Sequence, residues 1–229
     1  MPPPVQRALV SDQVFRALCE EILSGTYEPG EKLPTQRALA AELGVNMASI
    51  REAVKRLEQL RLVDVRHGDA MRVRDWRDHG GLDVVAHVLF RAGGLDQQTL
   101  ASLLEARQLM LRESARLAAE RRSAAQARAL AEIAGRIAAA PDPATAQALD
   151  FAFMAELADA SGNVVFRLIL NSIRELYFQR SELFEGVVAD LDELAPHYRR
   201  AASAVEAREP ARAASAVEKL ARLQEAGLA

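Results

Sequence analysis

The chain has one cysteine, nine prolines and no long apolar run among its 229 residues. The single cysteine, Cys19, excludes an internal disulfide framework and indicates a reducing compartment. We expect its thiol to be buried, with a redox sensor as the alternative. No apolar run approaches the roughly 20 residues that cross a bilayer, and residues 1–5 do not follow the plan of a signal peptide. These absences favour a cytoplasmic protein.

Catalytic motifs are also missing. The sequence has no Gly-rich phosphate loop, no nucleophile elbow and no Cys–His arrangement suited to nucleophilic catalysis. We therefore expect no enzyme activity.

Helix-forming residues dominate what is present. Half of the residues are hydrophobic, which is enough for a core, and the length allows one or two domains. Alanine and leucine are abundant, while proline and glycine become sparse after residue 94. The composition predicts a mainly α fold.

Charge is nearly balanced over the chain but not along it. The formal net charge is −3. Residues 31–77 carry ten Lys and Arg against seven Asp and Glu, whereas residues 78–229 carry 17 against 21. The mild positive excess at 31–77 is consistent with contact to DNA.

The segment from Tyr27 to Val73 has the order of a winged helix-turn-helix. Thr35 is a suitable N-cap for its first helix, and Gly44 lies in the tight turn before the next. A short basic turn separates two alternating strands. In this part of the chain we expect helices over 36–43 and 47–60 and strands over 62–66 and 70–74. A further helix over 12–24 precedes them.

A polar stretch divides the chain. We expect a flexible arm at 1–10, a winged helix-turn-helix at 11–75, a linker at 76–81 and an all-helical effector-binding and dimerisation domain at 82–229. Glycine- and proline-containing breaks predict the helices of the last domain. They cover 82–92, 97–121, 123–139, 144–160, 163–185, 190–208 and 210–227.

The third helix of such a fold enters the major groove, where its first residues reach base edges. An arginine one turn later suits a phosphate or a guanine, and the wing tip suits a phosphate or the minor groove. The residues expected at DNA are Arg37, Asn46, Met47, Ala48, Ser49, Arg51, His67 and Gly68. The alternative is a small helical cap with a solvated charged face.

The motifs YEPGEKLPTQRALAAELGV at 27–45 and SIREAVKRL at 49–57 resemble the GntR family of bacterial transcription regulators. The resemblance implies DNA contacts for Arg37 and Arg51. Many members also carry an arginine early in the recognition helix, where this chain has Met47. A bidentate Arg–guanine contact contributes roughly 1–3 kcal/mol of discrimination, so the operator is expected to differ from the usual half-site.

The motif ALDFAFMAELADASGN at 148–163 resembles the helical ligand domain of the FadR subfamily. Many members hold a divalent metal with one Asp and three His. The positions matched here are Asp150, Met154, His197 and Lys219, so only Asp150 and His197 remain. Met and protonated Lys do not suit such an ion. We expect no metal, and Lys219 as an ion partner for Asp150.

Loss of the metal favours a longer apolar effector. The fatty-acid regulator that gives the subfamily its name lacks the metal ligands and binds long-chain acyl-CoA, which is therefore the first candidate. Cations are needed for its anionic end. The residues expected around the effector are Arg107, Met110, Leu111, Phe153, Met154, Ile173, Tyr177, Phe184, His197 and Lys219. Each apolar one has plain core packing as its alternative.

These observations predict a homodimeric regulator on a pseudo-palindromic operator. A small organic or sugar acid, with or without a metal, is the second effector candidate, and regulation by protein contacts alone is the third. Two other classes are also considered. An enzyme would turn acyl-CoA over, and an architectural DNA binder would show a steep salt dependence and little sequence preference.

Overall fold

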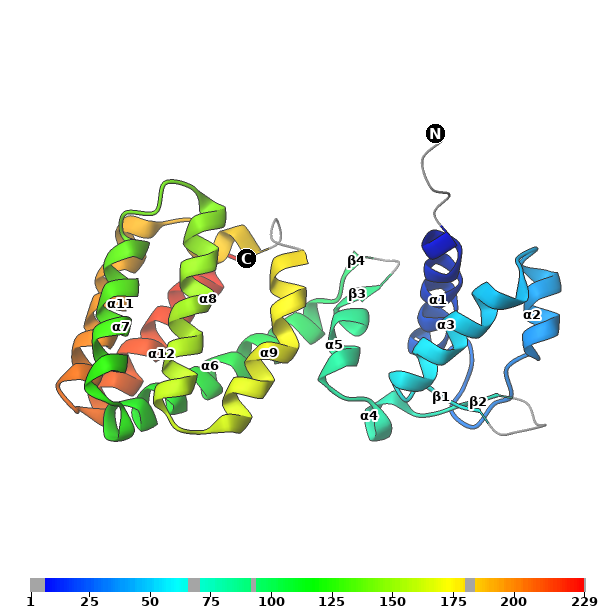
Figure 1. Ribbon diagram of the computed structural model, residues 1–229, viewed down its shortest axis with the longest axis horizontal. Coiled ribbons are helices and arrows are strands. Elements are labelled where there is room, and N and C mark those ends of the chain that lie inside the picture. Colours follow the sequence, from blue (N-terminus) through cyan, green and yellow to red (C-terminus); the bar gives the residue numbers. More distant parts are fainter. Residues whose placement is uncertain (1–6, 66–70, 92–93, 180–183, 229) are drawn as a thin grey trace. The chain divides into compact units, whose positions relative to one another are not determined.

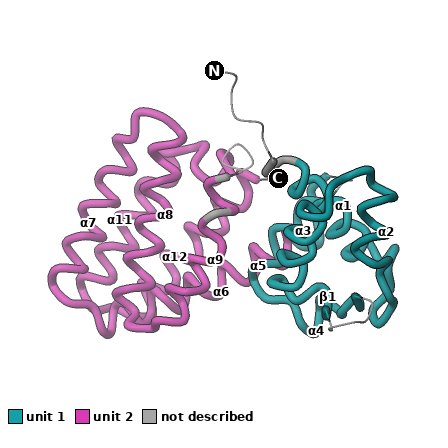
Figure 2. The backbone as a smooth tube through the Cα atoms, turned by 45° about the vertical axis from the view of Figure 1, so that its right-hand side comes forward, with its two compact units in different colours: residues 1–99 teal, residues 100–229 magenta. Residues whose placement is uncertain are grey.

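The computed structural model describes residues 7–65, 71–91, 94–179 and 184–228 of the chain. It is mainly helical (Figure 1) and divides into two compact units, residues 1–99 and 100–229, which Figure 2 colours separately. Within the described residues, no helix is long and apolar enough to span a membrane.

Three helices form the core of unit 1: α1 (Arg7–Ser24), α2 (Gln36–Glu42) and α3 (Met47–Gln59). Large apolar side chains from all three are buried, among them Phe15, Leu39 and Ile50. Helix α1 also carries Cys19, which is buried as expected. Burial is the main reason that the pKa of this thiol is raised to about 12.

The wing is a short antiparallel hairpin of β1 (Val63–Asp64) and β2 (Arg72–Val73). The chain between α1 and α2 pairs with the other side of β2. Gly30 N–H donates to Val73 O at 2.8 Å, and Leu33 N–H donates to Met71 O at 2.8 Å. The hairpin is therefore tied to the segment that leads into α2.

The connection after the wing also belongs to unit 1. It contains α4 (Trp76–His79), α5 (Leu82–Leu89) and the pair β3 (Phe90–Arg91) and β4 (Gly94–Leu95). Val84 and Val88 of α5 are buried in the same core as α1 and α3, and Arg61 pairs with Asp83 at 3.0 Å. Residues that follow the expected linker at 76–81 thus pack in the core of unit 1.

Unit 2 is a helical bundle. Its elements are α6 (Gln97–Arg121, which begins in unit 1), α7 (Ala124–Ile137), α8 (Pro143–Ala160), α9 (Val164–Gln179), the 3-10 helix η1 (Glu185–Val188), α11 (Leu191–Glu206) and α12 (Pro210–Ala226). Side chains from α6, α7, α8, α11 and α12 share one core, in which Tyr198 is fully buried. Small residues are frequent there, so the helices approach closely.

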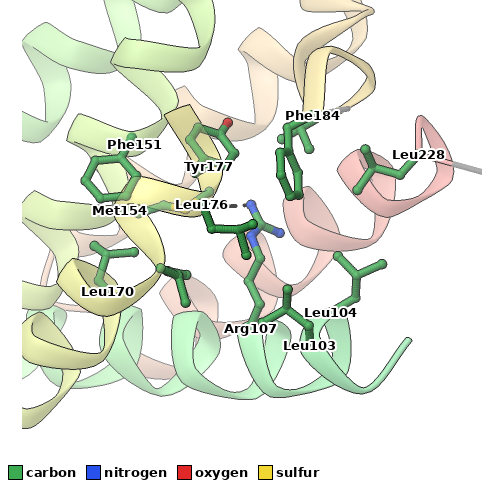
Figure 3. A pocket seen from close by; sticks show the side chains of 12 residues that line it. Leu103, Leu104, Arg107, Phe151, Met154, Leu170, Leu176, Tyr177, Phe184 and Leu228 are labelled. Carbon is green, nitrogen blue, oxygen red and sulfur yellow. Dashed lines mark hydrogen bonds between the residues drawn. The ribbon is translucent and has the colours of Figure 1, made fainter. Parts of the chain in front are cut away.

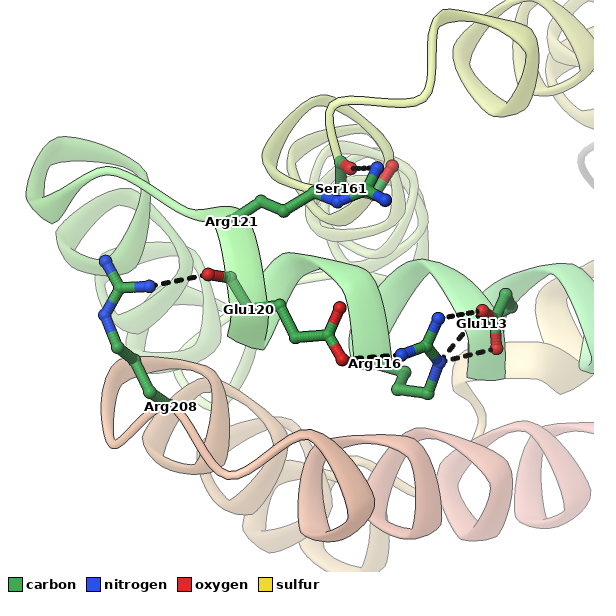
Figure 4. A network of polar contacts seen from close by, with 6 residues as sticks. All are labelled: Glu113, Arg116, Glu120, Arg121, Ser161 and Arg208. Carbon is green, nitrogen blue, oxygen red and sulfur yellow. Dashed lines mark hydrogen bonds and ion pairs between the residues drawn. The ribbon is translucent and has the colours of Figure 1, made fainter.

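Two arginines complete the C-terminal turns of α6 and α11 reciprocally. Arg208 lies in the turn after α11, and its guanidinium donates to Glu120 O at 2.7 Å (Figure 4). It also donates to Arg122 O at 3.1 Å. Arg122, at the end of α6, donates to Val205 O at 3.3 Å and to Glu206 O. Each arginine thus satisfies carbonyls that a helix end leaves without partners.

The helix boundaries agree with the sequence expectations in most places, and three differ. Helix α1 begins at Arg7, so the expected arm at 1–10 is partly helical. Residues 90–91 form a strand and not the end of a helix. The helix expected over 163–185 ends, within the described residues, at Gln179, and a 3-10 turn follows at 185–188.

Candidate DNA-binding face and effector cavity

Side-chain caps fix the start of both helices of the helix-turn-helix. Thr35 Oγ1 accepts from Ala38 N–H at 3.2 Å, and Asn46 Oδ1 accepts from Ser49 N–H at 2.9 Å. Between the helices, Gly44 has φ +64°, where a residue with a side chain would be strained. The tight turn and the two caps hold α3 at a defined angle to α2.

Two arginines lie exposed on these helices. Arg37 is on the first turn of α2, and Arg51 is one turn into α3. Neither has a hydrogen bond or ion pair with another described residue. Arg56, further along α3, differs because it pairs with Asp12 and lies over the Phe15 ring, 4.0 Å from its centroid. The two exposed guanidinium groups are thus available to an external anion.

The first turn of α3 is less polar than its sequence suggests. Ala48 is exposed and Met47 is half-buried. Ser49 is buried, and its hydroxyl donates to Asn46 Oδ1 at 3.3 Å. Ser49 therefore supports the cap and does not face outward, so the structure gives no support for the base contact expected of it. His67 and Gly68, expected at the wing tip, lie outside the described residues.

A cavity of about 50 Å³ opens among α6, α8, α9 and the C-terminal end of unit 2. Its walls are almost entirely apolar (Figure 3). The lining residues are Leu103, Leu104, Arg107, Phe151, Met154, Leu170, Ile173, Leu176, Tyr177, Phe184, Val187 and Leu228. One water needs roughly 10–15 Å³ of such space, so the cavity admits a few non-hydrogen atoms as it stands.

Arg107 is the charged residue in this lining. Its side chain rises from α6 into the ring of apolar groups (Figure 3). One nitrogen, Nη2, donates to Gln224 Oε1 at 2.6 Å and lies 3.7 Å from the Met154 sulfur. The charge of Arg107 also lowers the pKa of Glu225, although burial has the larger effect and raises it. The cavity therefore combines apolar walls with one cation.

Half of the predicted effector residues line this cavity: Arg107, Met154, Ile173, Tyr177 and Phe184. Leu111 and Phe153 line a separate space of only about 10 Å³ in the core. Met110 packs against the core. For these three residues, core packing is the better interpretation.

Asp150 lies next to the cavity and is completely buried. Three side chains donate to its carboxylate. Tyr198 O–H donates to Oδ1 at 2.5 Å, Gln224 Nε2 donates to Oδ1 at 2.8 Å, and Tyr177 O–H donates to Oδ2 at 3.0 Å. The pKa of each tyrosine is raised above its ordinary value, mainly by burial and secondly by the charge of Asp150. Both phenols therefore remain protonated donors.

The residues expected to accompany Asp150 do not do so. Lys219 is exposed and belongs to neither cavity lining, and His197 is buried elsewhere. Tyr198 and Gln224 occupy their places. His197 and Tyr198 are neighbours on α11, and neighbouring side chains of an α-helix point about 100° apart. Only one of the two can therefore face Asp150. Burial, Arg200 and Lys219 lower the pKa of His197.

The groups around Asp150 do not fit a divalent metal. Tyr198 is a protonated phenol, Gln224 turns its amide N–H toward the carboxylate, and Met154 offers a soft thioether. In the described part of the chain, no three His, Cys, Asp or Glu side chains gather to form a metal site. The arrangement is a hydrogen-bonded cluster built around one buried charge.

The sequence contains a signal for Gln224 that was not used. Gln224 follows Val217, Leu220 and Ala221 at helical spacing on α12, and all four are buried. A polar residue on an apolar helix face usually has a specific partner, because an unpaired amide is costly to bury. No comparable signal distinguishes the apolar lining residues, such as Leu103 and Leu176, from core.

Comparison with known proteins agrees with this geometry. Residues 10–73 match the model described as bacterial regulatory proteins, gntR family, and residues 102–222 match the FCD domain. The HTH-type transcriptional regulator Mce2R of Mycobacterium tuberculosis is 36% identical over 98% of this chain and 94% of its own length.

Other relatives are more distant. A fatty acid metabolism regulator protein of Yersinia pestis is 29% identical over 70% of this chain and 66% of its own length. The HTH-type transcriptional regulator LutR of Bacillus subtilis is 32% identical, over 69% and 71%. A solved structure, Streptococcus agalactiae GntR, shares the fold with a TM-score of 0.51 and 24% identity over 94% of this chain and 99% of that one.

Proposed function

Because the chain belongs to the gntR family of bacterial regulatory proteins and is a DNA-binding transcription regulator, we propose that α3 reads a specific operator and that a small carboxylate in unit 2 controls this reading. The observation that carries the DNA half is the pair of exposed arginines on α2 and α3, Arg37 and Arg51, without partners among the described residues.

On the operator, α3 lies in the major groove with its capped end toward the bases. Arg37 and Arg51 contact phosphates or a guanine, as the family resemblance implies. Met47 and Ala48 supply apolar contacts, of the kind that recognise a thymine methyl group. Asn46 uses Oδ1 within the cap, which leaves its Nδ2 as the group that faces DNA. A homodimer places two such helices on a pseudo-palindromic site.

Selection of DNA from a random pool, followed by binding measurements over a range of salt, tests this half. Arg51→Ala should weaken binding about 10-fold or more and reduce the salt slope by roughly 0.9 per lost phosphate contact. The matched control is Arg128→Ala, because Arg128 is an exposed arginine on α7 of unit 2. Equal affinity of the Arg51 variant, or enrichment of no sequence, would refute the proposal.

The effector proposed is a short-chain carboxylic acid with an apolar body. Arg107 supplies the cation for the carboxylate of the ligand. Phe151, Leu170 and Leu176 surround its hydrocarbon chain. A guanidinium suits a carboxylate because its N–H groups match the two oxygens. The cavity of about 50 Å³ is far below the roughly 300–1,000 Å³ of drug-sized pockets, which favours a small ligand. Hexanoate and octanoate fit only if the lining side chains move outward.

Long-chain acyl-CoA is the second candidate. The apolar walls and the similarity to a fatty acid metabolism regulator protein of Yersinia pestis favour it. It requires the helices around the cavity to move apart, and it requires further cations for its phosphates. Either ligand controls DNA binding only through different affinities for the DNA-bound and released states.

Calorimetric titration of chelator-treated protein distinguishes the candidates. The probes are butyrate, hexanoate, octanoate and palmitoyl-CoA. Saturable binding of a short acid, lost in Arg107→Met, supports the first candidate, and binding of palmitoyl-CoA alone supports the second. If none of the four binds, or if Arg107→Met binds them as the wild type does, the cavity is not the effector site.

A further inference from the structure

A continuous path of hydrogen bonds joins the buried Asp150 to the cavity. Gln224 donates through Nε2 to Asp150 Oδ1 at 2.8 Å, and it accepts through Oε1 from Arg107 Nη2 at 2.6 Å. The path crosses from α8 through α12 to α6. Gln224 is therefore the link between a buried anion and the cation that lines the cavity.

The orientation of the Gln224 amide follows from its partners. Its Nε2 lies 2.8 Å from Asp150 Oδ1 and 2.8 Å from the Tyr198 oxygen, and Nε2 has two N–H groups for these two acceptors. The amide oxygen must then point the other way, toward Arg107. Because Gln224 is only 1% exposed, a flipped amide would set its oxygen against the carboxylate with no water to compensate.

This anchor uses only one nitrogen of Arg107. The polar contacts of its guanidinium within the described residues both involve Nη2. Its Nη1 makes no such contact within the described residues, and the two N–H groups of this nitrogen can donate to a carboxylate oxygen of a ligand. A bidentate ion pair of Arg107 with Asp150 through both terminal nitrogens would have used Nη1 as well. Placing a neutral amide between the two charges leaves it available.

We propose that Gln224 is a positioning residue for effector binding: it holds Arg107 by Nη2 so that Nη1 is left to donate to the carboxylate of the ligand. The inference rests on the proposed function, in which that ligand is a carboxylic acid. Gln224 itself does not line the cavity. It acts through Arg107, and its own position is fixed by the hydrogen bond that it donates to Asp150.

Gln224→Met tests the role, because methionine is similar in length but offers no amide. The readout is the affinity ratio between hexanoate and 1-hexanol, which share a chain and differ in charge. We expect hexanoate to bind the variant roughly 10- to 100-fold more weakly, since a hydrogen bond to a charged group is lost. Binding of 1-hexanol should change less than about twofold, so the preference for the acid collapses.

The matched control is Gln147→Met. Gln147 is also a buried glutamine of unit 2, 1% exposed, and it lines neither cavity. This variant should keep the preference for hexanoate even if it lowers stability. An equal loss for hexanoate and 1-hexanol in Gln224→Met, or an unchanged ratio, would mean that Gln224 has only a structural role and would overturn the inference.

A second measurement does not depend on any ligand. In ¹⁵N NMR spectra of the free protein, the Arg107 Nη2–H signals should be resolved in the wild type, because the bond to Gln224 Oε1 slows rotation about Cζ–Nη2, and they should be averaged in Gln224→Met. If no acid binds the wild type, the proposed function fails while this comparison still decides the positioning role. An Arg107 signal that is unchanged by the substitution would refute that role on its own.

Discussion

Replacement of Tyr198 by phenylalanine should destabilise unit 2 by about 2–3 kcal/mol. Tyr198 is completely buried, donates to Asp150 Oδ1 at 2.5 Å and accepts from Gln224 at 2.8 Å. A hydrogen bond to a charged group contributes roughly 1.5–3 kcal/mol, and an unsatisfied buried donor costs about 1–3 kcal/mol. The two costs overlap, because Gln224 keeps its bond to the carboxylate.

Tyr177→Phe provides the comparison. Tyr177 is only partly buried, and it donates a hydrogen bond of 3.0 Å to the same carboxylate. Its loss should cost about 1 kcal/mol, because water can replace part of the interaction. Each kcal/mol corresponds to roughly 3–5 °C in melting temperature for a unit of this size. The expected decreases are therefore about 6–15 °C for Tyr198→Phe and about 3–5 °C for Tyr177→Phe.

Thermal unfolding of the full chain followed by circular dichroism, with urea titrations for the free energies, measures both variants. The double variant should differ from the sum of the single ones, since both phenols donate to Asp150. A Tyr198→Phe protein within about 0.5 kcal/mol of the wild type, or a Tyr177→Phe protein that is less stable than Tyr198→Phe, would refute the account of Asp150 as a buried charge held by these donors.

Three further predictions concern other parts of the chain. Gly186→Ala should destabilise unit 2 by about 1–3 kcal/mol in urea titrations, because a Cβ at Gly186 would lie 2.0 Å from Gly227 O. Gly135→Ala, whose Cβ would have nothing within 4 Å, should instead stabilise α7 by roughly 0.5–1 kcal/mol. Equal effects of the two substitutions would contradict this. Burial, and then Arg56, lower the pKa of His87 in the folded state, so the unfolded chain binds this proton at higher pH. Stability should fall as the pH drops below the ordinary value of 6.5, and melting curves of His87→Gln should show a smaller fall; identical curves would exclude this role. The Cys19 thiol, with its pKa raised to about 12, should react with a disulfide reagent at pH 8 only as fast as unit 1 opens, and immediate labelling would refute its burial.

The sequence was sufficient where local chemistry determines structure. Thr35 and Gly44 identify a cap and a turn by residue type alone, and both have the expected conformations. The helices of unit 2 were found because proline and glycine interrupt long apolar patterns. The polar composition of 76–81 indicates exposure, but it does not reveal that Val84, just after this stretch, packs in the same core as α1 and α3, because that is a tertiary contact.

The candidate site was harder to predict, since it depends on which face of each helix points inward. Arg107 and Tyr177, which were expected around the effector, line the cavity. His197 was expected near Asp150 because the family resemblance places it at a metal-ligand position, whereas the three-dimensional packing shows that Tyr198 faces Asp150. Cavity lining and solid core have the same apolar sequence pattern, so Leu111 and Leu170 could not be distinguished in advance.

The reciprocal arginine caps of α6 and α11 have a consequence for hydrogen exchange. Arg122 and Arg208 reach carbonyls that lie 83 to 88 residues away along the chain. Ends of helices usually fray and exchange their amides through small local openings. Here the last turn of each helix is completed by a side chain beyond the other helix, so neither end can open without releasing the other. The final amides of α6 and α11 should therefore exchange together, at the rate of the larger cooperative opening of unit 2.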